Sequence, residues 1–180
     1  AEIAHFLREV KFARLKNGSK RPLYLHSDAS QALNLLEVNV SRLGVDLLTI
    51  NSAKVYGPKG VGALYVNDRV LKTKALVPVV YGGGQEKGLR SGTENVPGAC
   101  AFAEAARIAC ESFDARIEKI LAVRTQLLSR LAADEVLQTA VTPNLPEVAA
   151  PHILSLTVNG FKSETVLNDL SGRGIYVSSG

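Results

Sequence analysis

Two side chains that could do chemistry each follow a predicted strand. Asp28 stands in "LYLHSDASQ", just past one strand, and Lys54 stands in "LLTINSAK", just past another. In open α/β sheets, ligands bind in the crevice beyond the carboxyl ends of the strands. A carboxylate and an amine at this edge could therefore face one ligand. Most lysines in loops are solvated and most aspartates after strands form turns, so the pattern alone leaves both interpretations open.

A lysine and an acid at one site would suit pyridoxal 5′-phosphate (PLP). A lysine in a dry pocket can form a Schiff base with this cofactor, and an acidic partner keeps its pyridine nitrogen protonated. Lys54 and Asp28 would fill these two roles. Gln31 could donate a hydrogen bond to the phenolic oxygen of the ring, and Asn51 and Ser52 could contact the phosphate.

The glycine-rich segments offer a competing interpretation as nucleotide loops. "GPKGVG" lacks the spacing of a Walker A motif, and "GGGQEKG" does not join a strand to a helix as a Rossmann loop does. Both segments are therefore predicted to be turns. Pro58 fixes one backbone angle, and Gly57 and Gly60 permit unusual conformations, so the first turn would hold Lys54 in one place.

The elements around these residues alternate between strands and helices. Apolar residues at helical spacing predict a helix over residues 1–16 and a helical turn over 41–44. Short strands are predicted over 22–26, 45–50 and 61–66, with a glycine-rich loop over 81–98. This alternation is typical of an α/β layer architecture.

The second half of the chain is more polar. One long helix is predicted from about Val96 to Leu131, followed by an irregular segment over 132–151. A strand over 152–158, a helix over 162–173 with Ser163 as its N-cap, and a strand over 174–177 complete the pattern. Because the chain becomes polar and loop-rich after the long helix, we expect a domain boundary within that helix, near residue 112, which gives two domains, residues 1–112 and 113–180.

Composition excludes several classes of protein. The net charge is +4, and the basic residues are scattered without aromatic interleaving, so nucleic-acid binding is not expected. Neither a membrane-spanning stretch nor a signal peptide stands out, which predicts a cytoplasmic protein. Cys100 and Cys110 are expected to be small buried side chains of a reducing compartment. No metal site is predicted. The helical start and the final "VSSG" suggest a fragment of a longer chain.

Two long segments carry a family resemblance. "HSDASQALNLLEVNVSRLGVDLLTINSAKVYGPKGVGALYV" (residues 26–66) and "GGGQEKGLRSGTENVPG" (82–98) closely resemble the cysteine desulfurases of the NifS/IscS type. These are class V aminotransferase relatives and PLP enzymes of fold type I. The resemblance implies an α/β fold. Residues 1–112 would be part of a large PLP-binding domain with a mixed, mostly parallel sheet, and 113–180 the start of a small α+β domain.

The resemblance also implies roles for single residues. Lys54 would bind PLP covalently and act as the catalytic base, Asp28 would hold the pyridine nitrogen, and Gln31 would hold the phenolic oxygen. Asn51 takes the place of a phosphate-binding serine. Thr93 is similar to the residue that reaches the phosphate of the neighbouring subunit's cofactor, which implies a homodimer.

Three departures from the family pattern stand out. Ala53 replaces the histidine that usually precedes the lysine, so one phosphate contact is lost or Ser52 replaces it. The segment that supplies the aromatic ring stacking on PLP does not match any part of the chain. The loop with the nucleophilic cysteine and the substrate-binding arginine is likewise unmatched, and Cys100 and Cys110 do not match that cysteine.

The expected activity is the PLP-dependent removal of sulfur from L-cysteine, giving alanine and an enzyme persulfide. The persulfide would pass to sulfur-acceptor proteins for iron–sulfur cluster assembly or tRNA thiolation. Selenocysteine lyase is a close variant with the same cofactor residues. A catalytically inactive fragment of such an enzyme is the alternative from a different class.

Overall fold

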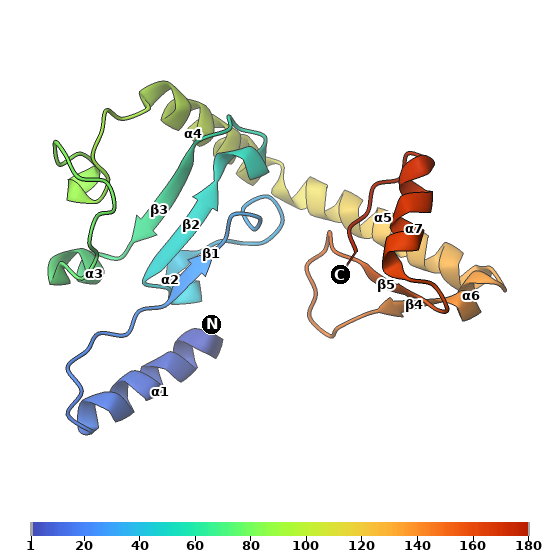
Figure 1. Cartoon of the computed structure of the whole chain (residues 1–180), viewed down its shortest axis with the longest axis horizontal. Coiled ribbons are helices and arrows are strands. Elements are labelled where there is room, and N and C mark those ends of the chain that lie inside the picture. Colours follow the sequence, from blue (N-terminus) through green and yellow to red (C-terminus); the bar gives the residue numbers. More distant parts are fainter. Residues whose placement is uncertain (1, 180) are drawn as a thin grey trace. The chain divides into compact units, whose positions relative to one another are not determined.

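The computed structural model describes residues 2–179, which divide into two compact units, one up to Phe113 and one from Asp114 on (Figure 1). Among these residues, no helix has the length and apolar character needed to cross a membrane.

The first unit contains a three-stranded mixed sheet and the helices around it. Its elements are α1 (Glu2–Lys16), β1 (His26–Asp28), α2 (Val40–Leu43), β2 (Leu47–Asn51), the 3₁₀ turn η1 (Ser52–Val55), β3 (Gly62–Val66), α3 (Asp68–Thr73), the 3₁₀ turn η2 (Glu86–Gly88) and α4 (Val96–Glu111). The strand order is β1-β2-β3, with β1 parallel and β3 antiparallel to β2. The prediction of a mixed α/β fold is therefore confirmed.

Two apolar clusters hold the sheet to its surroundings. In the first, Ala29, Val45 and Leu48 are buried, and the loop after β1 and the α2 region pack against them. In the second, Val55 from η1 is buried with Phe102 and Ala109 from α4. Burying a valine or phenylalanine side chain contributes roughly 1.5–3 kcal/mol to stability. The contact of Val55 with Phe102 therefore fixes η1 against α4.

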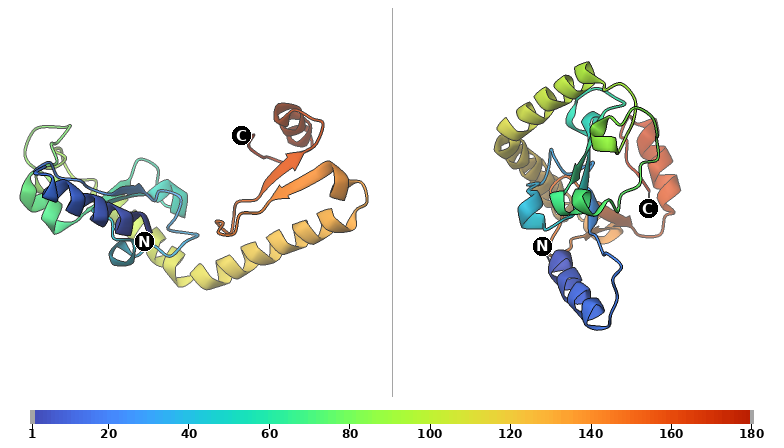
Figure 2. Two further views of the ribbon diagram at one scale, coloured as in Figure 1. Left: turned by 90° about the horizontal axis from the view of Figure 1, so that it is seen from below. Right: turned by 90° about the vertical axis from the view of Figure 1, so that its left-hand side faces the viewer.

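The second unit is built on a β-hairpin. Its elements are α5 (Phe113–Ala133), α6 (Leu137–Ala140), β4 (Val141–Asn144), β5 (Ser155–Val158) and α7 (Ser163–Gly172). β4 and β5 pair antiparallel, with Val141 opposite Val158 and Asn144 opposite Ser155. The left view of Figure 2 shows α5 on one side of this hairpin and α7 on the other.

Several predicted elements differ from the structure. The strand predicted over 22–26 starts only at His26, because the Leu25 N–H donates to the carboxylate of Asp46 instead of a strand carbonyl. The prediction of a single long helix is wrong. The segment forms two helices, α4 and α5, that meet at Ser112, whose hydroxyl donates to the Ile108 carbonyl at 2.7 Å. α3 lies in a segment for which no element was predicted.

The second unit brings three further corrections. β4 occupies part of the segment predicted to be irregular. The strand predicted over 174–177 does not form, and no described strand pairs with it. Lys162, not Ser163, is the N-cap of α7, and it makes no capping hydrogen bond through its side chain.

Candidate functional site

The candidate site lies at the edge where β1 and β2 both end. Parallel pairing places Asp28, the last residue of β1, opposite Thr49, and β2 then ends at Asn51. η1 follows directly and carries Lys54. The structure thus brings the ends of both strands to one edge of the sheet, as the sequence predicts.

Asp28 is held as an anion by its own loop. Its Oδ1 accepts hydrogen bonds from the Ser30 hydroxyl and from the Ser30 N–H, the latter at 2.9 Å. These two bonds lower the pKa of the Asp28 carboxyl below its ordinary value of 3.8, and His26 adds a smaller effect in the same direction. His26 itself is bonded to the Thr49 hydroxyl at 2.8 Å. The carboxylate is exposed and available to a cationic partner.

The turn that carries Lys54 is tightly constrained. The Asn51 side chain accepts from the Ala53 N–H at 2.9 Å and so caps η1. Tyr56 ends the turn with a φ of 63°, an uncommon conformation for a residue other than glycine. The turn predicted in "GPKGVG" is present at Lys59 and Gly60, where Gly60 has a φ of 80°. The Lys54 side chain is exposed, however, so the described residues do not enclose it in a dry pocket.

A buried asparagine joins the two halves of the site. Asn34 is 5% exposed, and its side-chain amide donates to the Lys54 carbonyl at 2.8 Å. Asn34 belongs to the loop that follows Asp28, so this bond ties that loop to the lysine turn. Asn34 was not among the residues predicted for this site. A polar side chain inside the apolar run "ALNLLEV" was the signal that could have found it.

Ser52 lies beneath the turn and has no access to a ligand. Its side chain is fully buried, and its hydroxyl has no hydrogen-bond partner among the described residues. A Cβ on Gly57 would collide with this hydroxyl and would lie 3.2 Å from the Cβ of Ala105. Glycine at position 57 therefore serves a close approach between the turn and α4.

Gln31 and Thr93 are less closely tied to this edge. Gln31 is exposed in the loop after Asp28. Thr93 is exposed in the segment between η2 and α4. No hydrogen bond joins either side chain to another residue in the part of the chain that the structure describes.

The prediction for the two cysteines is wrong. Cys100 and Cys110 are both exposed free thiols on α4. The buried stripe of this helix is formed by Gly98, Phe102 and Ala109, and the two cysteines fall outside it.

The chemistry of the edge fits PLP. An anionic carboxylate and an exposed primary amine follow neighbouring parallel strands, and the Asn34 bond links their loops. A carboxylate of lowered pKa suits the protonated pyridine nitrogen, and an amine can bind the aldehyde covalently.

The chain is similar to known proteins over most of its length. Residues 12–180 match the aminotransferase class-V family. "Cysteine desulfurase IscS 1" of Archaeoglobus fulgidus is 36% identical over 156 residues, which cover 87% of this chain and 39% of the relative. The mitochondrial cysteine desulfurase of Saccharomyces cerevisiae is 37% identical over 161 residues, which cover 89% of this chain and 31% of the relative.

Solved structures agree with the sequence relatives. A "NifS-like protein" superposes with a TM-score of 0.74 at 33% identity, covering 93% of this chain and 44% of that one. DndA from Streptomyces lividans gives a TM-score of 0.68 at 31% identity, covering 96% of this chain and 44% of that one. The chain thus spans less than half the length of these relatives.

Proposed function

The chain belongs to the aminotransferase class-V family, and from this we propose that the protein acts as a PLP-dependent cysteine desulfurase. The observation that carries the proposal is the edge where Asp28 and Lys54 follow two parallel strands, joined through Asn34. The similarity to cysteine desulfurases at 36–37% identity supports the same reaction.

Lys54 would bind the cofactor through its amine and then, once released, move the Cα proton of the substrate. Its position on η1 fixes the main chain on both sides: Asn51 caps the turn, and Asn34 bonds the Lys54 carbonyl. A constrained main chain limits where the exposed amine can reach, which is what a positioned base requires.

Asp28 would hold the pyridine nitrogen in its protonated form. A carboxyl of ordinary pKa is already ionised at neutral pH, and the Ser30 bonds lower the pKa of Asp28 further. PLP, when bound, supplies an electron-withdrawing ring that stabilises negative charge at the substrate Cα. Gln31, on the same loop, would donate to the phenolic oxygen.

Asn51 and Thr93 would bind the phosphate group of the cofactor. Asn51 stands at the start of η1, and Thr93 is exposed, so a second copy of the chain could present it to a neighbouring cofactor in a homodimer. Ser52 would act indirectly, by supporting η1 from below, because its side chain is fully buried.

The proposed substrate is L-cysteine and the products are alanine and a persulfide on an acceptor thiol. Sulfur-acceptor proteins of iron–sulfur cluster assembly would take the persulfide sulfur. We leave Cys100 and Cys110 out of this role, because both lie on α4 and neither matches the nucleophilic cysteine of the family.

Reduction of the protein with borohydride in the presence of PLP tests the lysine. We expect one phosphopyridoxyl group per chain, mapped by peptide mass to Lys54. Lys59→Ala is the matched control, since Lys59 is an exposed lysine of the same segment. The adduct should persist in Lys59→Ala and disappear in Lys54→Ala.

Turnover tests the reaction. Alanine formation from L-cysteine should fall about 10²–10⁴-fold in Lys54→Ala, the range for loss of a general base. Unchanged turnover in Lys54→Ala, or an adduct that maps to another lysine, would refute the assignment.

A further inference from the structure

A cavity opens at the end of β2 opposite to the candidate site. Its volume is about 340 Å³, and it is lined by α1, α2, the residues just before β2 and the β3–α3 junction. Cavities of this size fall at the lower end of those that bind small molecules. The lining includes three cationic side chains, those of Arg8, Lys11 and Arg69.

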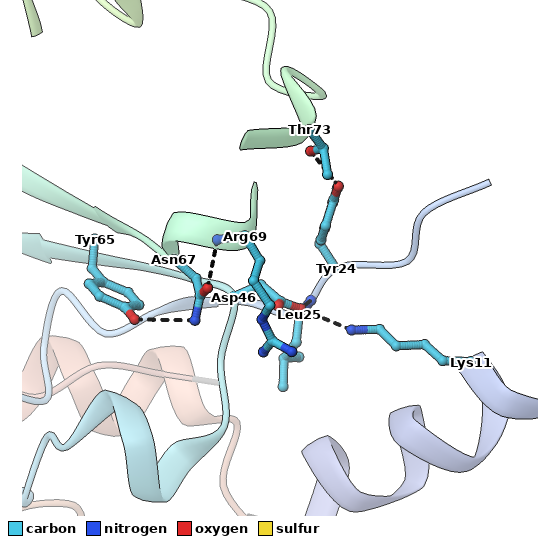
Figure 3. Close-up of polar contacts among 8 residues, drawn as sticks. All are labelled: Lys11, Tyr24, Leu25, Asp46, Tyr65, Asn67, Arg69 and Thr73. Carbon is cyan, nitrogen blue, oxygen red and sulfur yellow. Dashed lines mark hydrogen bonds and ion pairs between the residues drawn. The ribbon is translucent and has the colours of Figure 1, made fainter. Parts of the chain in front are cut away.

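A buried carboxylate organises the walls of this cavity. Asp46 Oδ2 accepts from the Leu25 N–H at 2.9 Å and from the Lys11 ammonium at 3.2 Å. Its main-chain carbonyl accepts from the Asn67 N–H at 2.9 Å. Figure 3 shows Lys11 from α1 and Arg69 from α3 extending toward the Leu25–Asp46 region. Asp46 thus links α1 to the sheet and to α3.

α3 is fixed in the same way. The Asn67 side chain accepts from the Arg69 N–H at 3.0 Å, which caps the helix. The Tyr24 hydroxyl is bonded to the Thr73 hydroxyl at 2.9 Å and ties the approach to β1 to the helix end (Figure 3). The cavity walls are therefore held by bonds that no ligand is needed to form.

The charges in the cavity do not balance. Asp46 is the single acidic residue of the lining, and it already pairs with Lys11. Within residues 2–179, the Arg69 guanidinium makes no hydrogen bond or ion pair, and Arg8 makes only a long contact of 3.5 Å with His5. Three cations against one carboxylate leave an excess of two positive charges.

We propose that this cavity binds a phosphoryl group, as inorganic phosphate or a phosphate monoester. A phosphate carries close to two negative charges at neutral pH and would match the excess. Guanidinium groups bind phosphate oxygens through paired, charge-assisted hydrogen bonds. The Tyr65, Asn67 and Ser41 side chains add neutral hydrogen-bonding groups to the lining.

This site is separate from the proposed PLP site. Asp46 precedes β2, whereas Asn51 ends it and Lys54 follows, so the two sites lie at opposite ends of one strand. Phosphate binding at this cavity does not depend on cysteine desulfurase activity, and either proposal can fail without the other.

Calorimetric titration of the purified protein with inorganic phosphate, and separately with glycerol 3-phosphate, tests the site at constant ionic strength. Saturable binding of either probe supports a phosphoryl site, and tighter binding of the ester assigns it to monoesters. Arg8→Gln and Arg69→Gln should each weaken binding about tenfold, the effect of losing a charge-assisted hydrogen bond.

The matched control is Arg42→Gln. Arg42 is an exposed arginine of α2 that pairs with Glu37 at 2.6 Å and does not line the cavity. Its variant should bind phosphate within about twofold of the unmodified protein, since exposed charges away from the cavity are screened. Arg69→Lys, which keeps the charge, should recover part of the affinity lost in Arg69→Gln.

Two results would overturn the proposal. The first is no saturable phosphate or monoester binding by a protein whose circular dichroism shows it to be folded. The second is equal weakening in Arg42→Gln and Arg69→Gln, which would mean that only the general positive charge of the protein attracts the anion.

Discussion

Substituting Gly57 by alanine should destabilise the protein through a contact with one particular atom. The added Cβ would collide with the Ser52 hydroxyl and approach the Ala105 Cβ to 3.2 Å. Overpacking of this kind costs about 1–3 kcal/mol. For a chain of this length, that corresponds to a fall in melting temperature of roughly 2–12 °C.

Ser52→Ala should rescue much of this loss. The Ser52 hydroxyl is buried without a described partner, so its removal alone should be neutral or stabilising by up to about 1 kcal/mol. In the Ser52→Ala background, the Gly57→Ala substitution no longer collides with the side-chain hydroxyl of residue 52 and should cost at least about 1 kcal/mol less. The remaining cost comes from the two contacts at 3.2 Å, with the Ala105 Cβ and with the main-chain oxygen of residue 52, which Ser52→Ala does not remove.

Urea unfolding of the four proteins of this double-mutant cycle measures the coupling. Gly60→Ala provides the control, because Gly60 has a φ of +80° and open space around it, so its cost is backbone strain alone. That cost should be the same in the unmodified protein and in the Ser52→Ala background. Additive effects of Gly57→Ala and Ser52→Ala, within about 0.5 kcal/mol, would refute the proposed contact.

Two further predictions concern the same unit. Ser30→Ala should raise the pKa of Asp28 toward its ordinary value of 3.8, as followed by carboxyl chemical shifts. Because the folded pKa is lowered, the Asp28 contribution to stability is present above about pH 3.8 and is lost as the pH falls through the folded value. Ser30→Ala should therefore flatten the stability loss in acid, and an unchanged Asp28 titration would contradict this. Phe102→Ala should lower the free energy of unfolding by about 3–5 kcal/mol, since Phe102 is 6% exposed and packs on η1. Ile108 lies on the same helix and is 51% exposed, so Ile108→Ala should lower the free energy of unfolding by less than half as much. Equal losses in the two variants would disprove the burial argument.

The position of Lys54 could be predicted from the sequence because it follows the apolar run over 45–50, most of which forms β2. The sequence predicts Asp28 after a strand over 22–26, whereas it is the last residue of the three-residue strand β1. A short apolar run predicts a strand, and the carboxyl ends of parallel strands meet at one edge. The hydrogen bond from Asn34 to the Lys54 carbonyl could not be predicted in this way. It joins residues on two loops, and it depends on how both loops fold back over the sheet.

The wrong predictions for the long helix and for residues 141–144 have local physical causes. The helical pattern continues on both sides of Ser112, so periodicity could not reveal that its hydroxyl bonds back to Ile108 and ends α4. Proline is disfavoured inside strands, so Pro143 weakens the sequence signal for a strand over 141–144. In a two-stranded hairpin, every strand is an edge strand, and an edge strand tolerates proline.

The strand predicted for the apolar run "GIYV" does not form, because it has no partner strand among the described residues. Its residues favour a strand, yet a strand needs a neighbour to receive its hydrogen bonds, and no described strand supplies one. Ile175 and Tyr176 are accordingly 51% and 84% exposed. A propensity read from the sequence therefore reports what a segment favours and not whether a partner is present.

The order of strands in the sheet has a consequence for folding kinetics. β2 and β3 are joined directly by the segment that holds Lys54, so their antiparallel pairing closes a short loop. β1 joins β2 in parallel only after the longer connection through α2 closes. Local pairings form faster than distant ones, so the lysine turn would form early and the Asp28 loop would dock late. The proposed catalytic pair would then be completed only after the lysine turn has formed, and a chain in which β1 has not yet paired would carry the amine without its carboxylate.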